Sequence, residues 1–251
     1  MKIKALLLTF VLLLSLVPIN CGAYGKVQGD YAASAKDFLN MLSITDGLDA
    51  DGEFITRAQF IDLVVKALNS EISAEIDGYF EDVPQNHVYA GSVYKAKTIG
   101  VISGKDSTKF YPDSSISHNE ATKVMVCALG YMGMAEVRGG YPIGYLAIAN
   151  DIALLKRVSA SSDYVTCQNA YIMICNMMHA DKCETKGVSG GNLLYSRAPG
   201  CTILSENWGL KSYSGVVRVA GHVSMEPGFY SEESVVSIDG VIFKTDFQNL
   251  E

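Results

Sequence analysis

The sequence predicts a mainly α-helical protein that ends in a small β module. Two observations predict this fold class: one spacing of apolar residues recurs three times behind a helix-start residue, and strand-like runs are confined to the part after Lys182. The three helix starts are Thr56, Ser117 and Thr166. Each is followed by apolar residues at positions +4, +7, +8, +11 and +12, the stripe of an amphipathic helix.

The recurrence is an internal repeat. All fifteen stripe positions are apolar, although only 49% of the chain is hydrophobic. The fifteen residues are Phe60, Leu63, Val64, Ala67, Leu68, Ala121, Val124, Met125, Ala128, Leu129, Ala170, Met173, Ile174, Met177 and Met178. A repeat of this kind favours a helical array with a holding or scaffolding role.

The N-terminus predicts export. Lys2 and Lys4 precede an apolar run from Ala5 to Val17, and small residues end at Ala23, so residues 1–23 have the pattern of a secretory signal peptide. A lipoprotein signal using Cys21 is the alternative. No other stretch is long and apolar enough to cross a bilayer, so we expect a secreted mature chain without a transmembrane segment.

Net charge limits the class of partner. The chain carries a formal charge of −7, and −9 without Lys2 and Lys4. An acidic chain of this kind is not expected to bind nucleic acid. An anionic ligand would need a local cluster of cations.

Candidate metal and catalytic residues are sparse. Five cysteines follow the signal peptide without a C-x-x-C pair, and the histidines show no metal-binding spacing. Cys183 and Cys201 flank a loop and could form a disulfide. The acidic loop from Asp46 to Glu53 lacks the closing Glu of a calcium-binding EF-hand. We therefore expect no metal, no cofactor and no catalytic residue.

The middle unit is the most complete of the three. A turn at Pro84 is followed by a predicted helix from His87 to Thr98, with Gly100 as its C-cap. A polar loop then leads to the second helix after Ser117. Each unit is thus expected to be helix, loop, helix.

Specific motifs accompany this pattern. They are Phe80-x-Asp82-Val83, His87-x-x-Ala90, Ile99-Gly100-Val101-Ile102-x-Gly104, Phe110-x-Pro112 and Ile116-Ser117-x-x-Glu120. Together they resemble one S-layer homology (SLH) module of the Gram-positive, clostridial cell-surface type. Ile55-Thr56-Arg57-Ala58-Gln59-Phe60 is similar to the family hallmark, which usually has Thr-Arg-Ala-Glu. The resemblance identifies three tandem modules at residues 32–70, 79–133 and 137–181, the second and third divergent.

The resemblance implies a pseudo-threefold array with one shared helical core. SLH proteins bind the secondary polysaccharide of the cell wall, often bearing pyruvate ketals, in grooves between modules, without covalent chemistry. The resemblance thus implies a secreted protein that is associated with the cell wall or the S-layer. The ligand-binding candidates are Thr56, Arg57, Gln59, Asp82, Gly104, His118 and Glu120. The alternative is a degenerate scaffold that assembles with S-layer or other surface proteins and binds no polymer.

The residues themselves leave the role of Arg57 open. Thr56 with Gln59, and Ser117 with Glu120, have the spacing of capping boxes, which accounts for those four residues structurally. Arg57 is not needed for a cap, and a cation in the first turn opposes the helix dipole by roughly 0.3–1 kcal/mol. We therefore expect an anion beside it, either an internal carboxylate such as Asp82 or Asp113 or a carboxylate of a ligand.

The positions equivalent to Arg57 are His118 in the second unit and Cys167 in the third. We therefore expect one or two competent grooves.

The C-terminal part predicts a linker and a β module. Residues 184–192 are rich in Gly and Ser, and short strand-like runs fill residues 193–251. Val235 to Phe243 predicts a hairpin around Asp239-Gly240. A spacer or protein-contact role is expected for this module.

Overall fold

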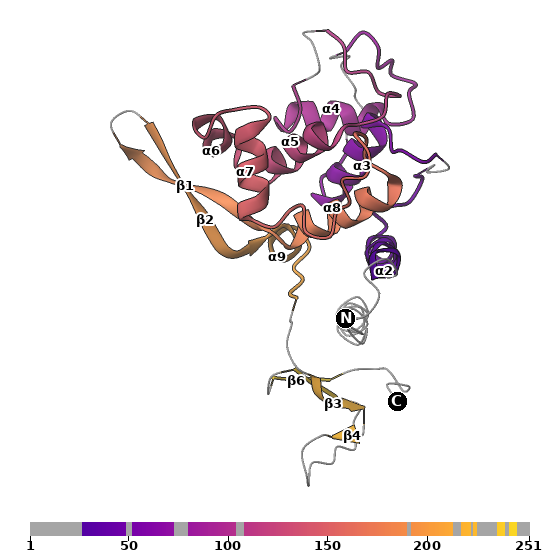
Figure 1. Ribbon diagram of the computed structural model, residues 1–251, viewed down its shortest axis with the longest axis vertical. Coiled ribbons are helices and arrows are strands. Elements are labelled where there is room, and N and C mark those ends of the chain that lie inside the picture. Colours follow the sequence, from indigo (N-terminus) through magenta and orange to yellow (C-terminus); the bar gives the residue numbers. More distant parts are fainter. Residues whose placement is uncertain are drawn as a thin grey trace. The chain divides into compact units, whose positions relative to one another are not determined.

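The computed structural model describes residues 27–48, 52–72, 80–103, 108–189, 192–212, 217–221, 223–224, 235–238 and 241–244. The predicted signal peptide lies outside these residues. The chain divides into two compact units, one spanning Gly25–Gly209 and one that contains the described residues from Leu210 onward (Figure 1).

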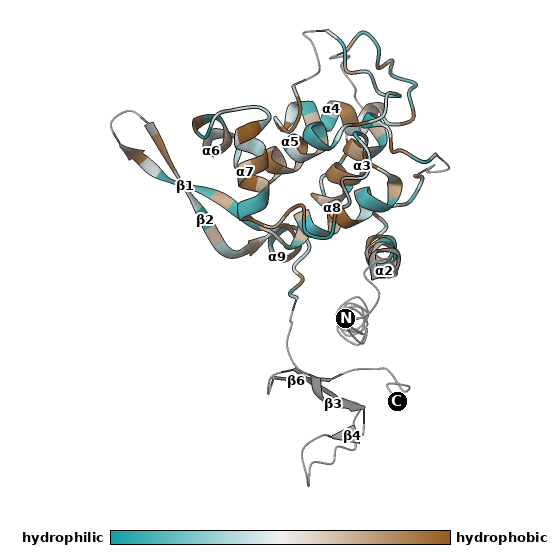
Figure 2. Ribbon diagram, viewed as in Figure 1, coloured by the Kyte–Doolittle hydropathy of each residue, from teal (hydrophilic) through white to brown (hydrophobic). Residues whose placement is uncertain are grey.

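The first unit is mainly helical, which confirms the predicted fold class. Its helices are α2 (Val27–Met41), α3 (Arg57–Ala67), α4 (Ala90–Thr98), α5 (His118–Ala128), α6 (Met132–Val137), α7 (Ile143–Asp151), α8 (Cys167–His179) and α9 (Ile203–Asn207). In Figure 2 these helices carry both apolar and polar residues, as the amphipathic pattern predicts. Of the fifteen stripe residues, all except the half-buried Ala128 are buried.

Helices α3, α5 and α8 begin where the sequence predicts. Their N-caps are Thr56, Ser117 and Thr166, and the first two form full capping boxes with Gln59 and Glu120. Helix α4 begins at Ala90, not at the predicted His87, because the residues before Ala90 form turns in which the His87 ring accepts a hydrogen bond from the amide of Tyr89.

A closed ring of hydrogen bonds joins the segments that precede the three long helices. Ile55 donates its amide to the carbonyl of Val165 at 3.0 Å, Val165 to Ile116 at 2.9 Å, and Ile116 back to Ile55 at 3.2 Å. All three side chains are at most 1% exposed. Each segment therefore lies between the other two, a pseudo-threefold arrangement around one apolar centre.

Helix packing follows the same cyclic order. Each of the three helices that follow a ring segment packs on the first helix of the next unit, in the pairs α3 with α4, α5 with α7, and α8 with α2. The loop after the first helix of each unit also repeats: Gly100, Ser43 and Ala153 have φ angles of 75°, 58° and 58°. The C-cap of α4 is Ile99, one residue before the predicted Gly100, which follows it in a left-handed turn. Ser43 and Ala153 adopt the same left-handed turn without glycine.

The predicted linker over residues 184–192 is wrong. β1 (Asp181–Ser189) and β2 (Asn192–Thr202) form an antiparallel hairpin instead, and with α9 they belong to the first unit, so the predicted domain boundary at residue 193 is also misplaced. Gly187, which suggests a linker, lies with a φ of 148° at an irregularity in the strand register. Cys183 and Cys201 are free thiols, so the disulfide considered between them is absent.

The second unit contains a small antiparallel sheet. Its strands are β3 (Val217–Gly221), β4 (Val223–Ser224), β5 (Val235–Ile238) and β6 (Val241–Lys244), in the order β4-β3-β5-β6. The predicted pairing of β5 with β6 is confirmed, and its turn residues lie outside the described residues. Among the helices described, none combines the length and apolar character that a membrane span requires.

Candidate functional site

A cavity of about 330 Å³ opens beside the N-terminal ends of α3 and α5. It is lined by Arg57, Val101, Ile102, Ser103, Glu120, Lys123, Val124 and Tyr141. These residues come from three units of the repeat: α3 of the first, the loop after α4 together with α5 of the second, and Tyr141, two residues before α7, of the third. The cavity therefore exists only because the ring brings the units together.

Arg57 is anchored inside the protein. Its Nε donates to the carbonyl of Phe110 at 2.8 Å, its Nη1 lies 3.0 Å from Oε1 of Glu120, and its guanidinium lies 4.8 Å from the centre of the Phe110 ring. The residue is 7% exposed. The internal anion beside Arg57 is thus Glu120. The expected pairing of Arg57 with Asp82 or Asp113 is wrong.

Glu120 serves two helices at once. While Oε1 pairs with Arg57 at the start of α3, Oε2 accepts from the amide of Ser117 at 3.0 Å and closes the capping box of α5. This carboxylate therefore fixes the two helix starts relative to each other. Hydrogen bonds to an ionised carboxylate are stronger than bonds between neutral groups, so the Arg57–Glu120 pair links the two helix starts strongly.

Lys123 is a cation of the cavity that the sequence reasoning missed. It lies three residues after Glu120 on α5, on the same helix face. Its Nζ lies 5.4 Å from the centre of the Tyr141 ring and 5.7 Å from that of Tyr145, within cation–π range. The signal that could have found it is its position six residues after Ser117, where the other repeats have Asp62 and Ile172.

Tyr141 contributes an aromatic wall. The residue is 48% exposed, and it lines the same cavity as Arg57 and Lys123. Burial, with a further contribution from Glu120, raises the pKa of its hydroxyl above the usual value, so the phenol is neutral at physiological pH. Tyr145 behind it donates its hydroxyl to Oε1 of Glu136 at 2.6 Å. Tyr141 thus presents a neutral ring with a polar tip.

Asp82 holds the loop beside Arg57 and does not line the cavity. Its Oδ1 accepts from the amide of Phe110 at 2.8 Å, and its Oδ2 accepts from the amide of Tyr111 at 2.7 Å. Tyr111 has a positive φ of 60°, so the two bonds stabilise an unfavourable backbone conformation. Asp82 acts on Arg57 indirectly, by fixing the carbonyl that Arg57 contacts.

The other predicted site residues have different positions. Thr56 and Gln59 form the capping box of α3 and are not among the cavity residues, and Gly104 lies outside the described residues. His118 lies at the next interface, where its amide donates to the carbonyl of Asp163 at 3.2 Å. Burial lowers the pKa of its imidazole, so the ring is neutral at pH 7. Of the seven candidates, Arg57 and Glu120 line the cavity.

The two equivalent interfaces have lost the cation pair. At the third, Cys167 replaces Arg57 and donates to the carbonyl of Gly52 at 3.3 Å, while Asp62 replaces Lys123. At the second, Asn169 replaces Glu120 and forms hydrogen bonds of 3.1 Å and 2.7 Å with the backbone of Ser159. Among the described residues, two cations meet at the cavity beside α3 and at neither equivalent position.

No group of three or more His, Cys, Asp or Glu side chains in the described part of the chain is arranged to hold a metal ion.

Comparison with known proteins agrees with these features. Residues 79–122, which supply the loop after α4 and the first half of α5, match the S-layer homology domain, so the chain contains an SLH domain.

Three similar proteins agree with this domain match. The chain is 34% identical over 61% of its length to a cell surface protein of Thermoanaerobacter kivui, and 27% identical over 63% to a middle cell wall protein of Brevibacillus brevis. It is 31% identical over 38% of its length to an exoglucanase of Acetivibrio thermocellus. The matched stretches are 21%, 16% and 9% of those proteins, so the chain spans a small part of each.

Proposed function

We propose that this chain is a non-catalytic surface protein, held at the cell wall by non-covalent binding of a secondary wall polysaccharide in the cavity beside α3. The observation that carries the proposal is the convergence of Arg57, Lys123 and the exposed ring of Tyr141 in a chain of net charge −7. The matched SLH domain and the surface and wall proteins among the relatives support a wall-associated role.

We also propose that the repeat consists of three SLH modules, at residues 32–70, 79–133 and 137–181. The matched domain covers the second of these. The closed hydrogen-bond ring and the cyclic helix pairs support the same assignment for the other two, because each unit contributes one segment and one helix pair to the array.

The charges favour an anionic sugar as ligand. Arg57 and Lys123 outweigh Glu120, so the described residues of the lining carry one excess positive charge. Since Arg57 already pairs with Glu120, a ligand carboxylate such as a pyruvate ketal would meet Lys123 first, and the ring of Tyr141 would pack against the sugar. Cavities of this size typically bind through apolar walls and a few placed polar groups.

The same geometry disfavours hydrolysis. Glycosidases use two carboxyl groups roughly 5–9.5 Å apart. Among the described residues, Glu120 is the one carboxylate in the lining, and its oxygens are held by Arg57 and by the amide of Ser117. A carboxylate fixed in this way is a poor proton donor.

Calorimetric titration of the mature chain with purified, pyruvylated wall polysaccharide tests the proposal. Lys123→Ala should weaken binding at least tenfold, and the charge-matched control Lys186→Ala, on an exposed part of β1, should bind as the wild type does. Equal affinity of the wild type and Lys123→Ala would refute the assigned site. The fitted stoichiometry should be one sugar site per chain, because the two equivalent interfaces lack the cation pair.

The alternative is a degenerate scaffold that binds surface proteins and no polymer. The loss of the arginine at His118 and Cys167 favours it. It predicts no heat of binding with purified polymer, together with self-association or co-purification with surface-layer proteins.

A further inference from the structure

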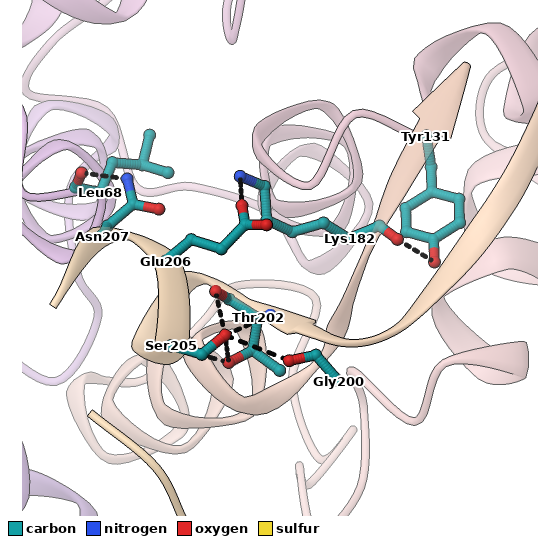
Figure 3. Close-up of polar contacts among 8 residues, drawn as sticks. All are labelled: Leu68, Tyr131, Lys182, Gly200, Thr202, Ser205, Glu206 and Asn207. Atoms are coloured by element: carbon teal, nitrogen blue, oxygen red, sulfur yellow. Dashed lines mark hydrogen bonds and ion pairs between the residues drawn. The ribbon is translucent and has the colours of Figure 1, made fainter. Parts of the chain in front are cut away.

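The segment that follows α8 returns to the C-terminal end of α5. The amide of Cys183 donates to the carbonyl of Leu129 at 2.8 Å. The hydroxyl of Tyr131 donates to the carbonyls of Asp181 at 3.0 Å and Lys182 at 3.3 Å (Figure 3 shows the second). β1 is thereby tied to the residues immediately after α5.

The same segment then reaches the C-terminal end of α3. The Asn207 side chain donates to the carbonyl of Leu68 at 2.7 Å, and the Asn69 side chain donates back to the carbonyl of Asn207 at 2.9 Å (Figure 3 shows the first). The indole of Trp208 donates to the carbonyl of Ala67 at 2.7 Å. The last carbonyls of a helix have no partner within it, so these side chains complete the end of α3.

Helix α9 is fixed in this position by a cap, an ion pair and two buried side chains. Thr202 and Ser205 form a capping box at its start, and Lys182 reaches Glu206 at 2.6 Å (Figure 3). Ile203 and Leu204 are at most 1% exposed. We call residues 181–189 and 192–208 the clasp. It is tied to the helical array at both of its ends, unlike a linker.

We propose that the clasp distributes force: it shares tension from the second unit among α3, α5 and α8, so that α8 is not loaded alone. Tension that arrives through Gly209 meets Trp208 and Asn207 first. A chain leaving directly from α8 would instead be pulled from His179, and the helix would open one hydrogen bond at a time. To release the clasp, the force must break three hydrogen bonds to the end of α3 and expose Ile203 and Leu204 in the same event.

The consequence is mechanical protection of the ring. Because Cys167 to His179 follows one of the three ring segments, peeling of α8 would remove Val165 from the closed hydrogen-bond ring. Load shared among α3, α5 and α8 does not peel α8 from its end and therefore leaves that ring intact. This inference does not depend on what the cavity binds.

Single-molecule pulling on the full mature chain tests the proposal. One handle is an azide-bearing residue at position 98, on the exposed end of α4, and the other is a C-terminal tag. At constant force the wild type should release the clasp in one step of up to about 100 Å, at roughly 3.5 Å per residue. The double variant Asn207→Ala with Trp208→Phe should rupture roughly thirtyfold faster, the factor expected for two lost hydrogen bonds.

The control Lys186→Ala, whose ion pair with Glu184 lies within β1, should rupture at the wild-type rate. If circular dichroism shows that the double variant does not fold, Trp208→Phe alone should give a roughly fivefold faster rupture. Equal rupture rates for the wild type and the clasp variants would overturn the proposal. So would gradual lengthening of the wild type from α8 before the clasp step.

Discussion

Replacing Arg57 by alanine should destabilise the protein before it affects any ligand. The change leaves the carbonyl of Phe110 and the carboxylate of Glu120 without their partner, at a residue only 7% exposed. Removing one member of a buried ion pair costs about 3–5 kcal/mol, and the 21% exposure of the Glu120 side chain reduces this to about 2–4 kcal/mol. The midpoint of thermal unfolding should fall by roughly 5–15 °C.

Urea unfolding monitored by circular dichroism measures this free energy. A double-mutant cycle with Glu120→Gln isolates the pair and should give a coupling energy of about 1–3 kcal/mol. Lys186→Ala, which removes an exposed cation, should stay within about 0.5 kcal/mol of the wild type. A loss below about 1 kcal/mol for Arg57→Ala would refute the buried ion pair and would return its guanidinium to the candidate ligand-binding groups.

Further outcomes follow from single features of the structure. Thr56→Ala removes the cap of α3 and should lower the free energy of unfolding by about 1 kcal/mol in the same urea assay, whereas Thr56→Ser should be near neutral. Gly144→Ala should cost about 3 kcal/mol or more by calorimetry, because its Cβ would overlap the backbone carbonyl of Ala135; a near-neutral result would contradict the packing of α7 on α6. Burial lowers the pKa of His118 and His179, so the folded state binds fewer protons than the unfolded one. Stability should be full above pH 6.5 and should fall as the pH drops below it, and His118→Gln with His179→Gln should flatten this part of the profile.

Local features of the fold could be predicted from the sequence. Thr56 and Ser117 are recognisable because a capping box depends on residues three apart, and Gly100 because a left-handed turn favours glycine. The ring through Ile55, Ile116 and Val165 could not be derived from the residues alone, since its partners lie far apart in the chain. The resemblance to SLH modules supplied that expectation.

In the candidate site, too, local features could be predicted from the sequence and long-range contacts could not. Arg57 was identified because a first-turn cation is unusual, but its partner was not, because Glu120 already had a complete explanation as a cap. Lys123 was missed because a lysine on an amphipathic helix is ordinarily a solvated residue. Lys123 lines a cavity because Tyr141, from the third unit, packs beside it in the folded protein.

The clasp was missed for a different reason. Its strands contain Gly187 and several polar residues, and their pairing follows an irregular register rather than an alternating apolar pattern. Its attachment depends on side-chain amides and an indole that contact helix ends more than a hundred residues away, at Ala67 and Leu68.

Retention on isolated cell walls tests the central claim most directly. Mature protein is mixed with sacculi from a Gram-positive cell, either intact or chemically stripped of secondary polysaccharide, and the bound fraction is measured after sedimentation. We expect retention on intact walls, at least tenfold less on stripped walls, and release by high salt, which screens Lys123. Equal retention on stripped and intact walls would contradict the account.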